Sequence, residues 1–297
     1  MMLNFKFIVS RVKIYFNIPY QLQRKVKSKF FREVFISLSK AFKPKSPTLF
    51  LQKSESRSVD ELNMTGWSDL GVFLDNEKIN GIFDTLKNIK LKDRYRPQHG
   101  EFNLDMVPSE THVADYKIDD WNSLPQIVNI ANTPSVLKIA EEYLGCKPTI
   151  SNIQLWWSFP GHDKSEEAEN FHRDVDDWKF VKLFIYLTNV DFESGPHVYV
   201  QKSISSHRYL PIKRYSDTEI EKYFGKENIK IMTGEKGSAF MEDTFGFHKG
   251  QLAKENRRLV LQVQYSINPI AINSYISKDS AMDVDPYINR LYLRRRP

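Results

Sequence analysis

Four stretches of the chain combine β-branched and aromatic residues with an alternating or continuous apolar pattern, which predicts strands. Three cover residues 149–158, 179–188 and 259–267. The fourth covers residues 237–248, and we expect His248 to close it. With so many strands in the second half of the chain, the pattern predicts a mainly β domain.

Two amphipathic helices are predicted ahead of these strands. The first begins near Asp75, where apolar residues follow at helical spacing. The second has Thr133 as its N-cap, Pro134 at its first position and Gly145 as its stop signal. The apolar faces contain Ile79, Ile82, Phe83 and Leu86 in the first helix, and Val136, Leu137, Ala140 and Leu144 in the second.

Other segments lack such periodicity. Residues 43–47 and 53–58 are rich in Ser, Pro and charged residues, so we interpret both as linkers. Residues 92–123 contain His99 and His112 in a long irregular stretch, which indicates a lid or substrate loop. Residues 269–297 form a polar C-terminal tail.

Composition limits the class of protein. With 297 residues, 41% of them hydrophobic, the chain can bury one sizeable core. Its single cysteine, Cys146, excludes an internal disulfide and a thiolate cluster, and a reducing cytoplasm is the expected location. We find no uncharged apolar run long enough for a transmembrane helix and no pattern typical of a signal peptide.

Positive charge is concentrated at the start of the chain. Residues 1–45 contain eleven Lys or Arg and one acid, Glu33, for a charge of +10, so the remaining residues sum to −4. This basic arm, interleaved with Phe and Ile, fits an anionic membrane surface, a phosphorylated substrate or nucleic acid. The simpler interpretation, which we favour, is an amphipathic helix pair that caps one end of the domain. We therefore divide the chain into an arm (1–45), a catalytic domain (46–268) and the tail, with no specific nucleic-acid signal.

A candidate metal site combines His172, Asp174 and the distant His248. Two histidines and one carboxylate are the ligand set that leaves open positions on a non-haem Fe(II) ion. Asp174 is preferred over Asp176 and Asp177, because one intervening residue in an extended segment returns two side chains to the same face. Downstream, an arginine at the start of the last strand is suited to bind a carboxylate through two hydrogen bonds.

Four blocks of sequence resemble the phytanoyl-CoA dioxygenase family of Fe(II)- and 2-oxoglutarate-dependent oxygenases. They are residues 152–158, 171–174, 182–200 and 247–261, and the resemblance covers about residues 149–268. It implies a double-stranded β-helix, which is a jelly-roll or cupin-like barrel, buttressed by N-terminal α-helices. The chain departs from the family pattern at residues 202–207, where the family often has Gly-Ser-His.

The resemblance also implies roles for single residues. His172, Asp174 and His248 hold Fe(II), Arg258 binds the distal carboxylate of 2-oxoglutarate, and Gln154 reaches the cosubstrate or the substrate. The reaction it implies hydroxylates a small molecule with O2, while 2-oxoglutarate is decarboxylated to succinate and CO2. Keeping Asp174 argues against the related halogenases, which have a small residue there.

Several alternatives stay open. Arg257 is the alternative to Arg258 for binding the cosubstrate. If Arg258 faces the barrel interior, Val260, Gln262 and Gln264 face it too. The opposite register would instead bury the more apolar residues of this strand. His197 and His207 are further candidates for substrate contact. A cupin-like metal enzyme that does not use 2-oxoglutarate, or an inactive binding barrel, would share part of the site. The substrate is unidentified, and a phosphorylated or otherwise anionic molecule is slightly favoured.

Overall fold

The computed structural model describes residues 20–26, 28–46, 50–206 and 211–295. Its centre is an eight-stranded antiparallel sheet with the strand order β1-β9-β6-β11-β5-β4-β2-β3. The long strands β5, β6 and β11 lie side by side in the middle of this sheet. The strands are β1 (Trp67–Val72), β2 (Leu91–Asp93), β3 (Glu101–Phe102), β4 (Val113–Tyr116), β5 (Thr149–Ser158), β6 (Phe180–Tyr186), β9 (Ser238–Glu242) and β11 (Arg258–Ser266).

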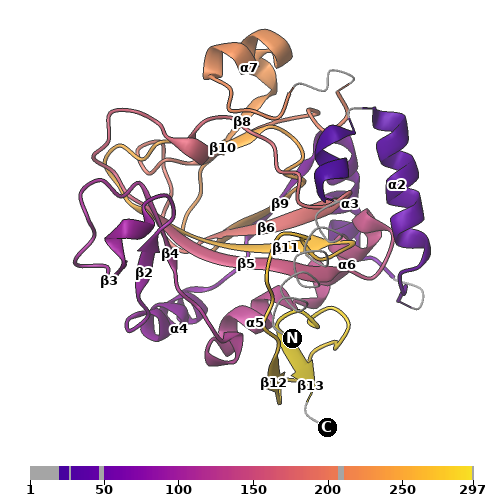
Figure 1. The fold of residues 1–297 in the computed structure, drawn as a ribbon, viewed down its shortest axis with the longest axis horizontal. Helices are drawn as coiled ribbons and strands as arrows, with labels where there is room; N and C mark the ends of the chain where they lie inside the picture. Colours follow the sequence, from indigo (N-terminus) through magenta and orange to yellow (C-terminus); the bar gives the residue numbers. More distant parts are fainter. Residues whose placement is uncertain (1–19, 27, 47–49, 207–210, 296–297) are drawn as a thin grey trace, which may run out of the picture.

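A second, smaller antiparallel sheet faces the large one (Figure 1) and has the order β10-β7-β8. An isolated bridge between His172 and His248 extends its β10 edge. Two strands of the C-terminal tail pair separately in parallel. These strands are β7 (His197–Val200), β8 (Ile229–Met232), β10 (His248–Gly250), β12 (Lys278–Ser280) and β13 (Leu293–Arg295).

Helices cover the outer surfaces of both sheets. Below the large sheet in Figure 1 lie α4 and α5, whereas α7 lies above the small sheet and α2 and α3 lie at one end. The helices are α2 (Lys29–Ala41), α3 (Lys53–Thr65), α4 (Asn76–Leu86), α5 (Pro125–Ala131), α6 (Pro134–Leu144) and α7 (Asp217–Phe224). Short 3-10 turns cover Pro97–His99, Trp121–Ser123, Glu167–Glu169 and Lys226–Asn228.

Alternation along the central strands separates two apolar clusters. In β11, Leu259 and Leu261 pack in the large cluster between the sheet and the helices. Val260 belongs to a second cluster between the two sheets, with Trp156 and Phe184. Successive side chains of a strand point to opposite faces, so Arg258 shares the inner face with Val260. The register with Arg258 inward is thus confirmed.

Both predicted amphipathic helices are present. Asp75 caps α4 by accepting a hydrogen bond from the backbone N–H of Lys78. Gly145 ends α6 in the left-handed conformation (φ 77°), which glycine adopts without a Cβ clash. Thr133 precedes α6 as expected, but its side chain makes no capping hydrogen bond.

Three expectations about local structure were wrong. Residues 53–58 are not a linker: they begin α3, where the backbone N–H of Gln52 donates to Oε2 of Glu55 at 2.7 Å, and the helix buries Leu62. Residues 92–123 are not a single irregular loop, since β3 and β4 extend the large sheet there. His248 does not close a strand, because β9 ends at Glu242 and a tight turn follows before β10.

The predicted helical arm is described from residue 20 onward, and its first 19 residues lie outside the described part of the chain. Residues 20–25 are helical, and α2 follows. Ile36 of α2 joins the large core cluster, and the ring of Phe35 stacks on Trp178 at 4.5 Å between centroids. Within the described residues, no helix is both long and apolar enough to cross a bilayer.

Candidate active site

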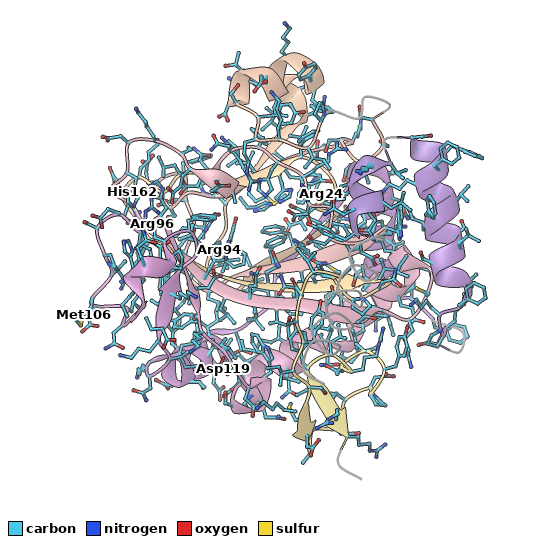
Figure 2. All side chains as sticks on the ribbon, viewed as in Figure 1. Arg24, Arg94, Arg96, Met106, Asp119 and His162 are labelled. Carbon is cyan, nitrogen blue, oxygen red and sulfur yellow. The ribbon has the colours of Figure 1, made fainter. Side chains whose placement is uncertain are left out.

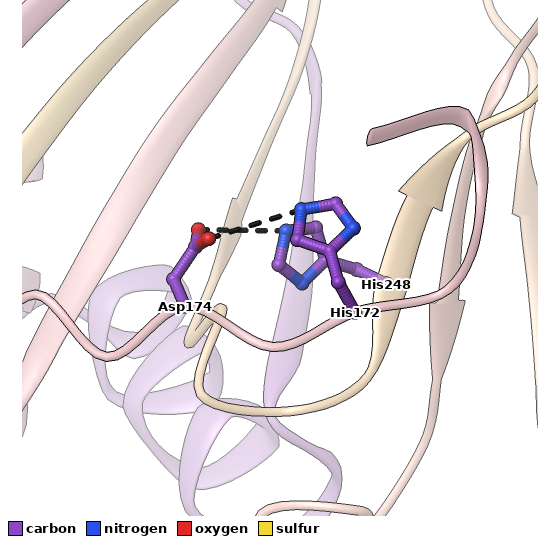
Figure 3. A group of neighbouring side chains, drawn as sticks. All are labelled: His172, Asp174 and His248. Carbon is purple, nitrogen blue, oxygen red and sulfur yellow. Dashed lines mark ion pairs between the residues drawn. The ribbon is translucent and has the colours of Figure 1, made fainter. Parts of the chain in front are cut away.

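The side chains of His172, Asp174 and His248 converge (Figure 3). Nε2 of His172 lies 3.8 Å from Oδ1 of Asp174, and Nε2 of His248 lies 3.5 Å from Oδ2. One ligand atom from each residue can be chosen so that all lie within 4.8 Å of one another. The structure therefore brings together the three residues predicted as metal ligands.

Backbone pairing holds the two histidines side by side. The N–H of each donates to the carbonyl oxygen of the other, at 2.9 Å in both directions, and their ring centroids are 4.3 Å apart. The backbone N–H of Asp174 donates to the carbonyl of Thr244 at 2.8 Å. Main-chain hydrogen bonds therefore hold together these residues, which are far apart in the sequence. Contacts between the side chains of the site are not needed for this.

The outer nitrogen of each imidazole is also fixed. Nδ1 of His172 lies 2.9 Å from the carbonyl oxygen of Asn170, and Nδ1 of His248 lies 3.1 Å from that of Gly246. Because a carbonyl oxygen only accepts, each Nδ1 carries a proton and donates. Nε2 of both rings is then the nitrogen that faces Asp174, which is the arrangement of metal-binding histidines.

Electrostatics favour the metal-binding forms of two ligands. Burial lowers the pKa of His172 well below its ordinary value, which keeps this imidazole neutral. Burial acts to raise the pKa of Asp174, but Lys182 and the two histidines outweigh it and hold that pKa well below the usual range. For His248, burial acts to lower the pKa, but the carboxylate of Asp174 outweighs burial, and the pKa of this imidazole is raised.

Lys182 is a close neighbour of the site that the sequence analysis missed. Its Nζ lies 2.7 Å from Oδ2 of Asp174 and 3.5 Å from Oδ2 of Asp176. The signal was present, because a lysine inside the otherwise apolar β6 is costly to bury unless it has a partner. Asp176 lies beside this lysine and outside the three-ligand group.

His197 and Glu242 form a layer behind His248. The ring of His197 stacks along that of His248 at 5.6 Å between centroids, and its Nε2 lies 2.9 Å from Oε1 of Glu242. Burial raises the pKa of Glu242 to about 8. Of the two further histidine candidates, His197 thus reaches the site, whereas His207 lies outside the described residues.

A cavity of about 510 Å³ opens beside the three candidate ligands. Gln154 and Arg258, the two residues predicted to reach the cosubstrate, both line it, together with Gln262. Oε1 of Gln154 accepts a hydrogen bond from Nε2 of Gln262 at 3.3 Å. Apolar side chains from the inner face of the large sheet, Val113, Trp156 and Phe184, complete this wall.

Arg258 is 3% exposed and has no anionic partner among the described residues. One Nη donates to the carbonyl of Gly195, the other lies 3.2 Å from Oγ of Ser158, and Nε has no partner. A Cβ on Gly250 would lie 3.1 Å from Nη2, so the absence of a side chain there leaves room for the guanidinium. Arg257 instead is exposed and lies over the ring of Trp157, at 4.9 Å from its centroid.

Comparison with known proteins adds fold similarity alone. No family model and no curated protein matches the chain. The apoform of EctD from S. alaskensis superposes with a TM-score of 0.53 at 13% identity, covering 86% of this chain and 93% of EctD. HygX from Streptomyces hygroscopicus, solved with nickel and 2-oxoglutarate bound, gives 0.51 at 13% identity, covering 79% of this chain and 93% of HygX. The chain has the fold of these two proteins.

EctD has also been solved with bound Fe, and that structure gives a TM-score of 0.51 at 14% identity, covering 86% of this chain and 94% of EctD. The predicted sheet-rich class is therefore confirmed. Its jelly-roll topology and the resemblance to the phytanoyl-CoA dioxygenase family stay predictions.

Several cations line the cavity. Arg24 and Arg94, both labelled in Figure 2, are two of them, and Lys213 and Arg214 contribute from the segment before α7. Carboxylates neutralise three of these cations, since Arg94 pairs with Asp115, Lys213 with Glu219 and Arg214 with Glu167. Nη1 of Arg24 has a neutral partner instead, the hydroxyl of Tyr20 at 3.1 Å. Sequence reasoning noted the charge of the arm but did not place Arg24 at the cavity.

Proposed function

We propose that the protein is an Fe(II)- and 2-oxoglutarate-dependent dioxygenase that hydroxylates a small, anionic substrate. One observation carries this proposal: the buried guanidinium of Arg258, without a carboxylate partner, lines the same cavity as His172, Asp174 and His248. A buried charge is normally paired. A dicarboxylate that reaches from a metal at the three ligands to Arg258 would supply the missing anion.

The donor set fits the metal. Two imidazole nitrogens and one carboxylate oxygen suit Fe(II) and leave positions for other ligands. The nitrogens face the carboxylate, and their rings are held by carbonyl acceptors on the far side. In related proteins, HygX binds nickel with 2-oxoglutarate and EctD binds Fe, which supports the same assignment here.

When bound, Fe(II) with 2-oxoglutarate supplies the oxidising chemistry: O2, 2-oxoglutarate and a substrate C–H group give succinate, CO2 and a C–OH group. The protein's residues perform the binding and positioning. Arg258 would hold the distal carboxylate through charge-assisted hydrogen bonds in a buried position. Trp156 and Phe184 exclude water from one wall, and the amide groups of Gln154 and Gln262 supply polar contacts.

The proposed substrate class rests on the cations that line the cavity. Arg24 lies there without a carboxylate partner in its described contacts, beside the paired cations Lys213 and Arg214. Arg24 is exposed, and such a cation beside the cavity attracts anions and raises their local concentration. We therefore propose a substrate that carries a phosphate or carboxylate group.

An anaerobic titration tests the reaction class. Adding Fe(II) and then 2-oxoglutarate should produce the weak metal-to-ligand charge-transfer band of a chelated cosubstrate, and admitting O2 should yield succinate. An inactive barrel would give no band, and a cupin-like enzyme of another class would show no dependence on 2-oxoglutarate. Either outcome would reject the proposal. A screen of metabolite pools for a product heavier by one oxygen, made only with 2-oxoglutarate, would then identify the substrate.

A further inference from the structure

Helix α2 and its C-cap residue Phe42 expose a continuous apolar stripe. Phe30, Val34, Leu38 and Phe42 follow one another at intervals of four residues, and Phe31 lies on the same side of the helix. The exposed fraction is 71% for Phe30, 57% for Phe31, 39% for Val34, 55% for Leu38 and 88% for Phe42. Single exposed apolar residues are common on proteins, but a contiguous patch of this kind marks an interaction site.

Among the described residues, none buries this stripe. The opposite side of α2 attaches the helix to the domain, with Ile36 buried in the core and the guanidinium of Arg32 donating to the carbonyl of Asp177 at 3.1 Å. Figure 1 shows α2 at the outer edge of the molecule, with the rest of the fold on one side of it. Packing within the described part of the chain therefore does not explain the stripe.

Charge identifies the partner that fits. The arm of residues 1–45 carries +10, and its one acid, Glu33, lies in α2. Lys25, Lys29 and Lys45 flank the stripe in sequence and are exposed. An aromatic apolar face bordered by lysines is typical of helices that lie in the interface of an anionic membrane. Acidic headgroups attract such segments, and the apolar side chains enter the acyl boundary.

We propose that α2 docks the protein on an anionic membrane surface through the stripe from Phe30 to Phe42. A second copy of the chain is a poorer occupant, because a symmetric contact through α2 would bring two arms of +10 together. Nucleic acid would match the charge and leave the apolar stripe without a partner. The inference is independent of the proposed reaction. Tyr20 and Arg24, which precede α2, line the cavity, so the docked arm also borders it.

Vesicle flotation of the full chain tests the proposal. Binding is expected to vesicles of phosphatidylcholine mixed with phosphatidylglycerol, to weaken at high salt, and to be much weaker with phosphatidylcholine alone. Replacing Phe30, Leu38 and Phe42 together by Ser should lower the partition coefficient roughly a hundredfold or more, since each loses buried apolar area. The matched control replaces three exposed apolar residues elsewhere by Ser, Met106, Phe192 and Ile276, and should bind like the wild type.

A second variant keeps the test independent of the apolar substitutions. Reversing charge at Lys25, Lys29 and Lys45 to Glu leaves the stripe intact and should abolish the preference for anionic vesicles. Three results would each overturn the proposal: no binding to anionic vesicles, equal loss in the stripe and control variants, or a wild-type dimer that the stripe variant dissociates in sedimentation velocity. Circular dichroism checks that the variants fold.

Discussion

Nζ of Lys182 lies 2.7 Å from Oδ2 of Asp174, so a buried strand lysine is hydrogen-bonded to the carboxylate of the candidate metal site. Burial acts to lower the pKa of Lys182, but Asp174 and Asp176 outweigh it and raise that pKa, which keeps the lysine charged. In the metal-free protein this ammonium group compensates the carboxylate. A bound metal ion would compensate the same charge.

We therefore expect Lys182→Met to destabilise the metal-free protein more than the metal-bound protein. Removing one partner of a buried ion pair typically lowers the free energy of unfolding by about 3–5 kcal/mol. Urea unfolding with a chelator, and again with saturating Ni(II), measures the two losses. Lys147→Met is the control: its pair with Asp285 is partly exposed and should contribute about 1 kcal/mol or less. Equal losses with and without metal would show that the lysine does not share the charge of the site.

The three candidate ligands predict a common phenotype. His172→Ala, Asp174→Ala and His248→Ala should each abolish succinate formation, and the two histidine variants should also lose iron binding, because one imidazole and one carboxylate hold the ion poorly. The main-chain hydrogen bonds around the site do not depend on these side chains, so circular dichroism should be unchanged. Metal content by mass spectrometry gives the readout, with His162→Ala as a histidine control outside the site. Full turnover in any one variant would show that its residue is misassigned.

Asp174→Gly is expected to behave differently. Glycine removes the carboxylate and leaves space for a small exogenous anion beside the two histidines. This variant should retain measurable iron binding while losing hydroxylation. Iron content and product formation, measured on the same sample, separate the two properties.

The sequence predicted the central strands well because each depends on local pattern. The run at 149–158 coincides with β5, and the run at 259–267 is displaced by one residue from β11. Hydrophobicity alone favoured burying Leu259 and Leu261 in the interior of the barrel. The structure resolves this conflict, because both faces of β11 are covered, one by helices and the other by the cavity wall.

Non-local contacts could not be predicted in the same way. Nothing in the sequence near Lys182 indicates Asp174 as its partner, and Glu242 meets His197 only because β9 and β7 belong to facing sheets. Helix α3 was missed because its polar residues resemble a linker until Leu62 is seen to be buried. Contacts between residues far apart in the sequence thus determine these features, which local composition does not reveal.

The raised pKa of Glu242 predicts that the stability of the metal-free protein depends on pH. Burial raises its pKa from 4.5 to about 8, so the folded state binds the proton more tightly than the unfolded state. Its contribution to stability is therefore complete below pH 4.5 and is lost as the pH rises through about 8. The slope from this group is at most about 1.4 kcal/mol per pH unit.

Glu242→Gln removes this titration. With a chelator present, the difference in unfolding free energy between variant and wild type should move in favour of the variant as the pH rises from about 5 to about 8. Glu235→Gln, at an exposed turn before the same strand, should follow the wild type. A constant difference across this range would mean that Glu242 keeps its charge throughout.

The neighbours Arg257 and Arg258 give the sharpest test of the cosubstrate site, because they point to opposite faces of one strand. Arg258 lines the cavity without a carboxylate partner, whereas Arg257 is exposed over Trp157. Losing a charge-assisted bidentate contact of roughly 1.5–3 kcal/mol should raise the KM for 2-oxoglutarate about tenfold or more in Arg258→Gln. Arg257→Gln should leave that KM unchanged. Succinate formation at varied 2-oxoglutarate measures both, and the reverse result would place the cosubstrate on the other face of β11.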